Sequence, residues 1–176
     1  ISKLVVAAEA LPVAKHILLR ANLLEDYHDP ADYEAFATRL GLPLIVKPND
    51  SGSSVGIMIV RALDELKDAV EQAFRYSSSV LLEEYIEGQE LTVSILDGKA
   101  LPVVEIRPKN GWYDYQNKYT KGNTEYLAPA PIDESISQLC QLYAEKAFFA
   151  LSCAVYGRVD FRLRDHIPYF LEVNTL

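Results

Sequence analysis

Two carboxylates, an amide and an arginine stand at alternate positions in the last two apolar runs of the sequence. Arg158 and Asp160 are two residues apart in the first run, and Glu172 and Asn174 are two residues apart in the second. Side chains two apart share one face of a strand. If the runs pair around a turn centred on His166, Arg158 lies opposite Asn174, and Asp160 lies opposite Glu172 with Cβ atoms about 4.5–5.5 Å apart. Hard Mg²⁺ prefers oxygen ligands of this kind, so the pattern predicts a divalent cation site.

The competing interpretation is that both carboxylates point to water. It is disfavoured because the second run is otherwise largely apolar, and its polar residues Glu172 and Asn174 fall on one face. The prediction depends on the register of the pair. A slip by one residue would turn one strand's side chains to the opposite face and separate the ligands.

A lysine and a loop of small residues suggest a phosphate site. Lys47 ends the apolar run 43–46, where a lysine can act as a point charge for phosphate. The loop 50–56 reads Asp-Ser-Gly-Ser-Ser-Val-Gly, and its backbone N–H groups and hydroxyls can surround phosphate oxygens. It contains no Gly-Lys-Ser/Thr and is therefore not a Walker A loop. Taken alone, Lys47 is more simply a solvated lysine at a strand end, and the loop a plain hairpin turn.

A polar and aromatic segment at 110–126 interrupts the regular pattern. Its 17 residues include Trp112, four tyrosines, Lys118 and Lys121. Structureless segments of this length are usually functional or disordered, and the aromatic content disfavours disorder. We expect a lid that carries Lys118 over a phosphate. Further back, the backbone at 83–86 can bind an adenine edge, and Glu90 is close enough in sequence to reach a ribose. The simpler alternative for these glutamates is exposure at strand ends.

Apolar periodicity and turn signals place these residues on an α+β framework. The expected helices are 3–10, 30–40, 63–74 and 132–151, and the expected strands are 16–19, 43–46, 57–60, 80–85, 91–96, 101–107, 156–164 and 168–175. Asp29 and Pro30 fit the start of the second helix, and Gly41 fits its end. The element order predicts two α+β lobes with a boundary near 83–88, and a cleft between two lobes is a common ligand site.

Composition excludes several classes of protein. The 176 residues carry a net charge of −8, which argues against a nucleic-acid surface but not against ATP, because Mg²⁺ and a few cations suffice there. No apolar run approaches the roughly 20 residues of a transmembrane helix. Cys140 and Cys153 have no metal-ligand spacing, so we expect packing residues in a reducing, cytoplasmic compartment. Since the chain starts at Ile1 and its only Met is Met58, we expect it to begin inside a longer gene product.

Taken together, these segments resemble the ATP-grasp superfamily, and specifically the D-alanine–D-alanine ligase family. The resemblance runs over essentially the whole chain. Each matching segment is short, but their joint order and spacing are specific. The matching segments are 42–48, 52–56, 83–90, 113–115, 118–119, 157–160 and 172–175.

The resemblance implies a nucleotide site. Lys3 and Lys47 would contact the ATP phosphates from the central lobe, with Ser54 in the neighbouring loop. Glu83 would bind adenine beside the backbone of Glu84 and Ile86. The resemblance also implies that Glu90 binds the ribose.

The resemblance implies a reaction site as well. Asp160, Glu172 and Asn174 would hold Mg²⁺, with Mn²⁺ as the alternative ion. Lys118 would reach the transferred phosphate, and Arg158 would steady the tetrahedral intermediate. Ser53 and Tyr119 would join a hydrogen-bond network with a glutamate of the family's N-terminal domain.

The resemblance also implies a domain plan. Residues 1–82 would form the central ATP-grasp lobe and 83–176 a truncated C-terminal lobe, with the nucleotide between them. We expect the family's N-terminal domain, with its glutamate, and the Pro-Gly-Met-Thr stretch that follows 174–175 in the family to lie outside this chain. We therefore expect the chain alone to bind ATP at best, with little or no ligation.

The implied activity is ATP-dependent ligation of two D-alanines through an acylphosphate, for peptidoglycan precursors. Tyr119 favours a dipeptide over a D-alanyl–D-lactate ester. The implied partners are ATP and D-alanine, with no nucleic acid and no membrane, and the full-length protein is expected to be a homodimer. The alternatives are another ATP-grasp ligase, which the lid sequence 113–119 disfavours, and a non-catalytic ATP-binding module, which the retained metal and phosphate residues disfavour.

Overall fold

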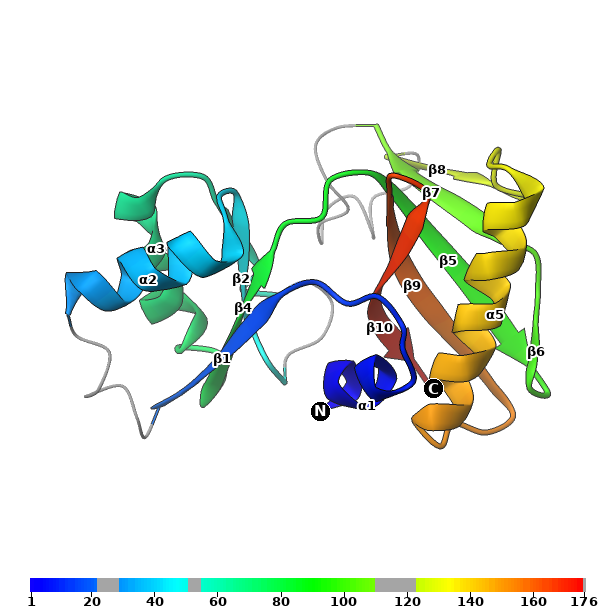
Figure 1. Cartoon of the computed structure of the whole chain (residues 1–176), viewed down its shortest axis with the longest axis horizontal. Coiled ribbons are helices and arrows are strands. Elements are labelled where there is room, and N and C mark those ends of the chain that lie inside the picture. The colour runs from blue at the N-terminus through cyan, green and yellow to red at the C-terminus, as the bar shows by residue number, and fades with distance from the viewer. Residues whose placement is uncertain (22–28, 51–54, 110–122, 176) are drawn as a thin grey trace. The chain divides into compact units, whose positions relative to one another are not determined.

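The described part of the chain forms two compact units in the computed structural model, which describes residues 1–21, 29–50, 55–109 and 123–175 (Figure 1). The smaller unit comprises Ala14–Tyr85. The larger unit comprises Ile1–Val13 together with Ile86–Leu176. The chain thus passes from one unit to the other between Tyr85 and Ile86, and its first 13 residues pack within the larger unit. The sequence-based lobes 1–82 and 83–176 stay a prediction.

The smaller unit is a sheet with helices packed on it. Its described residues form a four-stranded antiparallel sheet in the order β1-β4-β2-β3. The strands are β1 (His16–Arg20), β2 (Leu44–Pro48), β3 (Met58–Val60) and β4 (Ser79–Glu84). The helices α2 (Pro30–Leu40) and α3 (Leu63–Ala73) place their buried residues in one apolar cluster with residues of the strands.

Local signals account for the helices of this unit. The Asp29 side chain accepts a hydrogen bond from the Ala31 N–H at 2.9 Å, and Pro30 occupies the first helical position. Gly41 ends α2 with φ of +82°, a conformation that favours glycine. On α3 the buried face contains Leu66, Ala69, Val70 and Ala73, and this face is the one that the apolar spacing predicts. These predictions are confirmed.

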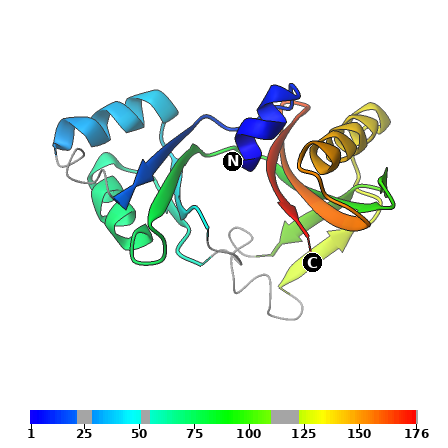
Figure 2. The same ribbon diagram turned by 90° about the horizontal axis from the view of Figure 1, so that it is seen from below.

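The larger unit is a sheet with α5 across one face, as the turned view in Figure 2 shows. Among its described residues, six strands are paired, with a main order of β10-β9-β5-β7-β8 and β6 paired to β5. The strands are β5 (Gln89–Leu96), β6 (Lys99–Ala100), β7 (Val104–Pro108), β8 (Thr124–Leu127), β9 (Tyr156–Arg164) and β10 (Ile167–Asn174). The helices are α1 (Ser2–Ala8) and α5 (Glu134–Ala150), and α1 contacts α5 and β10.

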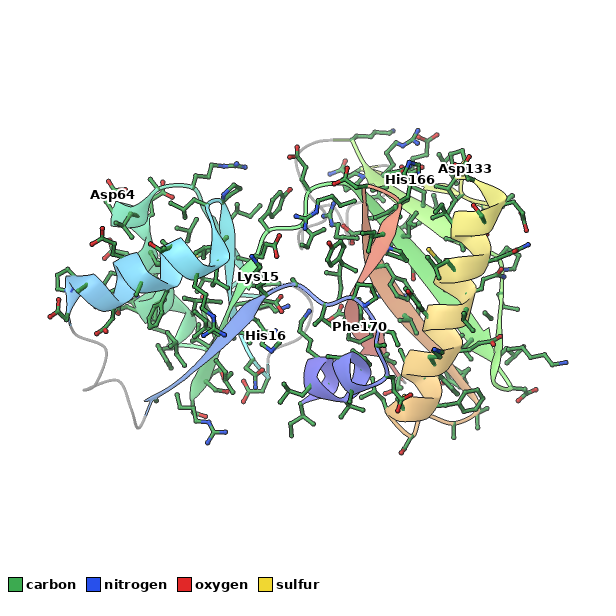
Figure 3. All side chains as sticks on the ribbon, in the orientation of Figure 1. Lys15, His16, Asp64, Asp133, His166 and Phe170 are labelled. Carbon is green, nitrogen blue, oxygen red and sulfur yellow. The ribbon has the colours of Figure 1, made fainter. Side chains whose placement is uncertain are left out.

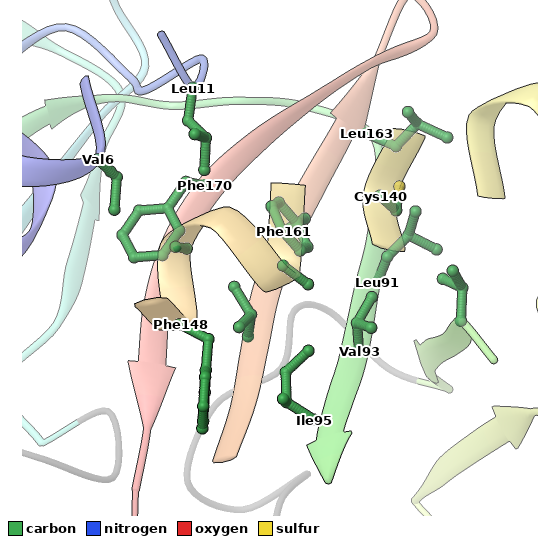
Figure 4. Packing of buried hydrophobic residues seen from close by; sticks show 14 of the residues in the cluster. Val6, Leu11, Leu91, Val93, Ile95, Cys140, Phe148, Phe161, Leu163 and Phe170 are labelled. Atoms are coloured by element: carbon green, nitrogen blue, oxygen red, sulfur yellow. The ribbon is translucent and has the colours of Figure 1, made fainter. Parts of the chain in front are cut away.

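One face of this sheet is the apolar core (Figure 4). Leu91, Val93 and Ile95 alternate along β5 and are buried together with Phe148 of α5 and Phe161 of β9. Because neighbours along a strand point to opposite faces, the residues between them lie on the face away from α5. The core therefore fixes which side chains of β5 and β9 are left for a polar site.

Two expected elements differ from the structure. The strand expected at 101–107 begins only at Val104, as β7, and a gap at 101–103 separates it from the short strand β6, which precedes the expected range. Pro102 lies in this gap, and proline has no N–H to donate to a ladder. The end of the segment expected as a loop at 110–126 forms β8, which pairs with β7 at the edge of the sheet. Edge strands tolerate polar residues such as those of 124–126, so apolar alternation did not reveal it. Residues 110–122 lie outside the described part of the chain.

None of the helices in the described ranges is long and apolar enough to cross a membrane.

Cys140 offers a test of the core. Burial in α5 raises the pKa of its thiol to about 12, which would leave roughly one thiol in ten thousand ionised at pH 8. Because the thiolate is the reactive form, a Cys153→Ser protein with Cys140 as its single thiol should resist alkylation at pH 8 while folded. The same protein should react fully in denaturant. Modification of the folded protein at the rate of a free cysteine would contradict the packing described here.

Candidate active site

The face of the larger unit's sheet that lies away from α5 carries a row of polar side chains. On β5 they include Glu90 and Thr92, and on β9 they include Arg158, Asp160 and Arg162. The strands pair antiparallel with Thr92 opposite Asp160 and Glu90 opposite Arg162. Directly opposed side chains on adjacent strands are close enough to interact. This face thus brings together residues more than 60 positions apart in the sequence.

Asp160 is the centre of the row. It is 6% exposed, and its carboxylate accepts hydrogen bonds from each neighbouring strand. The Thr92 hydroxyl donates to Oδ1 at 2.6 Å. Arg158 binds in a bidentate manner, with Nε to Oδ1 at 2.9 Å and a terminal guanidinium nitrogen to Oδ2 at 2.9 Å. The Asn174 amide donates to Oδ2 at 3.0 Å. These bonds offset part of the cost of burying an ionised carboxylate.

Opposing effects act on the pKa of Asp160. Burial raises this pKa above its usual value, and the negative charge of Glu172 adds to the rise. The hydrogen bonds and charge of Arg158, with the bond from Thr92, act in the opposite direction. The net direction is upward, because desolvation is the largest effect. Any additional cation near Asp160 and Glu172 would favour the ionised form and relieve the repulsion between the carboxylates.

The pairing predicted for the last hairpin is confirmed. Glu172 lies opposite Asp160 and Asn174 lies opposite Arg158. The predicted turn, however, is wrong. Arg164 pairs with Ile167, so the loop contains only Asp165 and His166, the latter labelled in Figure 3. Both loop residues have positive φ, 52° and 63°, as a two-residue type I′ turn requires.

A register shift at Leu171 restores the predicted pairs. Phe170 still lies opposite Phe161, whereas Glu172 lies opposite Asp160, so the ladder shifts by one residue between them, as at a β-bulge. Continued without the shift, the ladder would have placed Glu172 opposite Val159, on the core face. Packing agrees with this shift, because Phe170 and Val173 both contact the apolar core although they are three residues apart.

The oxygen atoms of Asp160, Glu172 and Asn174 suit a hard divalent cation. Glu172 is exposed, and the Asn174 amide nitrogen lies 3.4 Å from its Oε1 and 3.0 Å from Asp160 Oδ2. Amide nitrogen and oxygen are assigned from hydrogen bonding, so a cation in this position would be met by the amide oxygen after a flip. Within the described ranges, no group of three or more His, Cys, Asp and Glu side chains could hold a metal ion. A site here needs the amide and would use phosphate oxygens.

In the smaller unit, two of the predicted ATP-binding residues contact each other. Lys47 Nζ lies 2.6 Å from Glu83 Oε2, across the paired strands β2 and β4. The Glu83 side chain is 5% exposed and the Lys47 side chain 23%. Partial removal from water strengthens the attraction between the two charges, and this attraction restrains both side chains. Glu84 follows on β4, where its N–H donates to the Lys15 carbonyl at 2.9 Å, and Lys15 and His16 are labelled in Figure 3.

Other predicted nucleotide residues lie in the larger unit. Glu90 is ion-paired with Arg162 at 2.8 Å. Ile86 is buried, 4% exposed. Lys3, expected with the central lobe, lies instead on α1 of the larger unit, where Nζ donates to the Phe170 carbonyl at 3.3 Å and lies 5.9 Å from the Phe170 ring centre. A phosphate role for Lys3 stays a prediction.

Comparison with known families decides the membership of this chain. The family model described as the D-Ala–D-Ala ligase C-terminus matches residues 5–176. The chain belongs to the D-Ala–D-Ala ligase family. The structures discussed below share its α+β ATP-grasp fold, so the predicted fold class is confirmed.

Relatives of known sequence agree. A D-alanine–D-alanine ligase from Methylacidiphilum infernorum is 51% identical over 135 residues, which are 76% of this chain and 45% of the relative. One from Clostridium perfringens is 42% identical over 148 residues, which are 84% of this chain and 48% of the relative. The chain therefore spans about half the length of the ligases that it matches.

Solved structures of the D-Ala–D-Ala ligase family and of a related ligase have the same fold. A Bacillus anthracis D-alanine–D-alanine ligase has a TM-score of 0.81 at 37% identity, and the match covers 99% of this chain and 55% of the ligase chain. A structure of D-alanine–D-alanine ligase from Bacillus anthracis complexed with ATP has a TM-score of 0.79 at 32% identity, and the match covers 99% of this chain and 53% of that ligase chain. A D-Ala:D-Ser ligase from Enterococcus faecalis has a TM-score of 0.83 at 31% identity, and the match covers 99% of this chain and 50% of that ligase chain. The fold of the ligase family thus accommodates more than one second substrate.

Some residues implied by the ligase resemblance are not placed by the structure, and others were missed by the sequence. Ser53, Ser54, Lys118 and Tyr119 lie outside the described residues. Thr92 and Arg162, which contact Asp160 and Glu90, were not predicted. A signal existed, because both lie two residues from a predicted site residue on the same strand, but their contacts depend on β5 pairing with β9.

Thr92→Val tests the hydrogen bond to Asp160. Valine keeps the side-chain shape but leaves Asp160 without the hydroxyl donor, and hydrogen bonds to charged groups contribute about 1.5–3 kcal/mol. We expect the free energy of unfolding, measured in urea, to fall by about that amount. Thr92→Ser, which keeps the hydroxyl, should lose less than half as much. Equal losses in both variants would assign the effect to packing and contradict the role of the hydroxyl.

Proposed function

We propose that the full-length protein carrying this chain is an ATP-dependent ligase that joins two D-alanines for peptidoglycan precursors. The observation that carries the proposal is the pairing of Asp160 with Glu172 and Arg158 with Asn174 on the polar face of a D-Ala–D-Ala ligase sheet. Directly opposed like charges destabilise a sheet, so two carboxylates on one face favour a further cation beside them, in addition to the Arg158 guanidinium that binds Asp160. The similarity to a Bacillus anthracis ligase whose structure is complexed with ATP supports ATP as the nucleotide.

The residues of this chain fit a phosphoryl transfer that needs positioning and charge neutralisation rather than a protein nucleophile. The carboxylate of one D-alanine attacks the γ-phosphorus of ATP, which gives an acylphosphate and releases ADP. The amine of the second D-alanine then attacks the acyl carbon, and phosphate leaves with the loss of the amine proton. Mg²⁺, held by Asp160, Glu172 and Asn174, would neutralise phosphate charge when bound, and Mn²⁺ would suit the same oxygens.

Each cationic residue has a distinct role in this proposal. Arg158 is fixed by its bidentate contact with Asp160, so its guanidinium is preorganised to stabilise the oxyanion formed when the amine attacks. Lys47, paired with Glu83, would bind phosphate while Glu83 binds adenine. Lys118 would neutralise the transferred phosphate, and Ser53, Ser54 and Tyr119 would complete the site. Lys3 would add a further cation for the phosphates.

The surroundings proposed for the enzyme follow from its substrates. ATP and Mg²⁺ are available in the cytoplasm, which we propose as the compartment. Association of the full-length protein as a homodimer is part of the proposal, as is the nucleotide site between the lobes 1–82 and 83–176. A second candidate function is ligation of D-alanine to D-serine, which is favoured by the TM-score of 0.83 to a D-Ala:D-Ser ligase.

The activity is tested by measuring the phosphate that the full-length protein releases from ATP in the presence of Mg²⁺. D-Alanine alone should support release with a dipeptide product, and L-alanine should not. D-Serine or D-lactate added with D-alanine should leave D-alanyl–D-alanine as the main product. If D-alanyl–D-serine were the main product, the second substrate would be D-serine instead of D-alanine. Absence of phosphate release despite ATP binding would contradict ligase activity.

A variant gives the control for this assay. Removing a preorganised group that stabilises an oxyanion typically lowers kcat by about 10²–10³. Arg158→Met should therefore reduce dipeptide formation by at least about 10² while ATP still binds. Activity within a fewfold of the unaltered protein would remove Arg158 from the mechanism.

A further inference from the structure

The backbone that leads into β5 approaches the backbone of β9 closely at a glycine. Gly88 has φ of +143°, and a Cβ added there would lie 1.9 Å from the Leu163 carbonyl oxygen, so no other residue fits without movement of the backbone. Gln89 and Glu90 follow at once and pair with Leu163 and Arg162. The chain that leads to Glu90 is thus held close to the backbone of β9.

Arg162 binds both the main chain and the side chain at this point. One terminal nitrogen donates to the Gly88 carbonyl at 2.9 Å, and the other lies 2.8 Å from Glu90 Oε2. The side chains of Arg162 and Glu90 are 15% and 11% exposed, so the pair is largely removed from water. A planar guanidinium can span two acceptors in this way, whereas a lysine ammonium is a single point charge.

We propose that Arg162 is a positioning residue that fixes the Glu90 carboxylate for the ribose hydroxyls of the nucleotide. This inference rests on the proposed function, in which Glu90 binds the ribose. A glutamate side chain has several rotatable bonds, and the ion pair with Arg162 removes that freedom before the ligand arrives. A carboxylate has lone pairs for several donors, so its contact with Arg162 is compatible with hydroxyl donors.

The charge of Arg162 supports the same role. Glu90 lies on the polar face that also carries Asp160 and Glu172, and ATP is itself a polyanion. A cation bound to Glu90 offsets the repulsion between this carboxylate and the phosphates. Arg162 thus lets a carboxylate serve as a hydroxyl acceptor beside a highly charged ligand. Arg162→Met removes the guanidinium and retains an unbranched side chain.

The test is the ratio of the Kd values of 2′,3′-dideoxy-ATP and ATP, measured with Mg²⁺ on the full-length protein. The unaltered protein should bind ATP on the order of tenfold more tightly, the size expected for hydrogen bonds to a charged group. In Arg162→Met the ratio should fall below about threefold, because ATP loses the hydroxyl contacts as well as the charge offset, whereas the dideoxy nucleotide loses only the charge offset. In a Glu90→Gln background, Arg162→Met should change the ratio less than about twofold, because the two residues act together.

Matched variants separate positioning from folding. Arg164 lies two residues further along β9 and contacts Tyr169 instead, so Arg164→Met should keep the ratio of the unaltered protein. Arg162→Lys should give an intermediate ratio, and it carries the test if Arg162→Met does not fold. Equal weakening of both nucleotides, or an unchanged ratio in the Arg162 variants, would overturn the proposal. If the unaltered protein bound no ATP, the proposed function would fail as well, whereas ATP binding and discrimination that survive Arg162→Met would overturn this inference alone.

Discussion

The burial of the Asp160 carboxylate is the constraint on which the larger unit's polar face depends. An ionised carboxylate that is only 6% exposed needs donors on several sides, and β5, β9 and β10 each provide one or more. Thr92 and Asn174 must therefore lie on the face that carries Asp160, while Phe161 and Phe170 must lie on the opposite face in the core. The register shift at Leu171 reconciles these demands on β10. A sheet with a uniform register could satisfy the core or the carboxylate, but not both.

Much of the framework was predictable because its causes are local. Asp29, Pro30 and Gly41 mark the ends of α2, and the apolar spacing of α3 identifies its buried face. The pairing of Asp160 with Glu172 was also predicted, but by two errors that cancel. The turn was centred on His166 instead of between Asp165 and His166, and the shift at Leu171 was not foreseen. The spacing of three between Phe170 and Val173 was the available sign of that shift.

The contacts between distant strands could not be predicted from the residues alone. Thr92 bonds to Asp160, and Arg162 to Glu90, only because β5 lies next to β9, although 59 residues separate the end of one from the start of the other. Lys3 was expected beside the central-lobe residues, but α1 packs against β10 and places Lys3 by Phe170. Side-chain pairing of this kind follows from sheet order, which a single sequence does not specify.

The central claim is that Asp160, Glu172 and Asn174 hold the cation that accompanies ATP. It is tested most directly by the ATP affinity of the full-length protein with and without Mg²⁺, in the unaltered protein and in Asp160→Asn with Glu172→Gln. Since each tenfold change in affinity corresponds to about 1.4 kcal/mol, loss of two anionic ligands should remove at least a tenfold enhancement by Mg²⁺. The account predicts that Mg²⁺ strengthens ATP binding only in the unaltered protein. An equal enhancement in the double variant would contradict it.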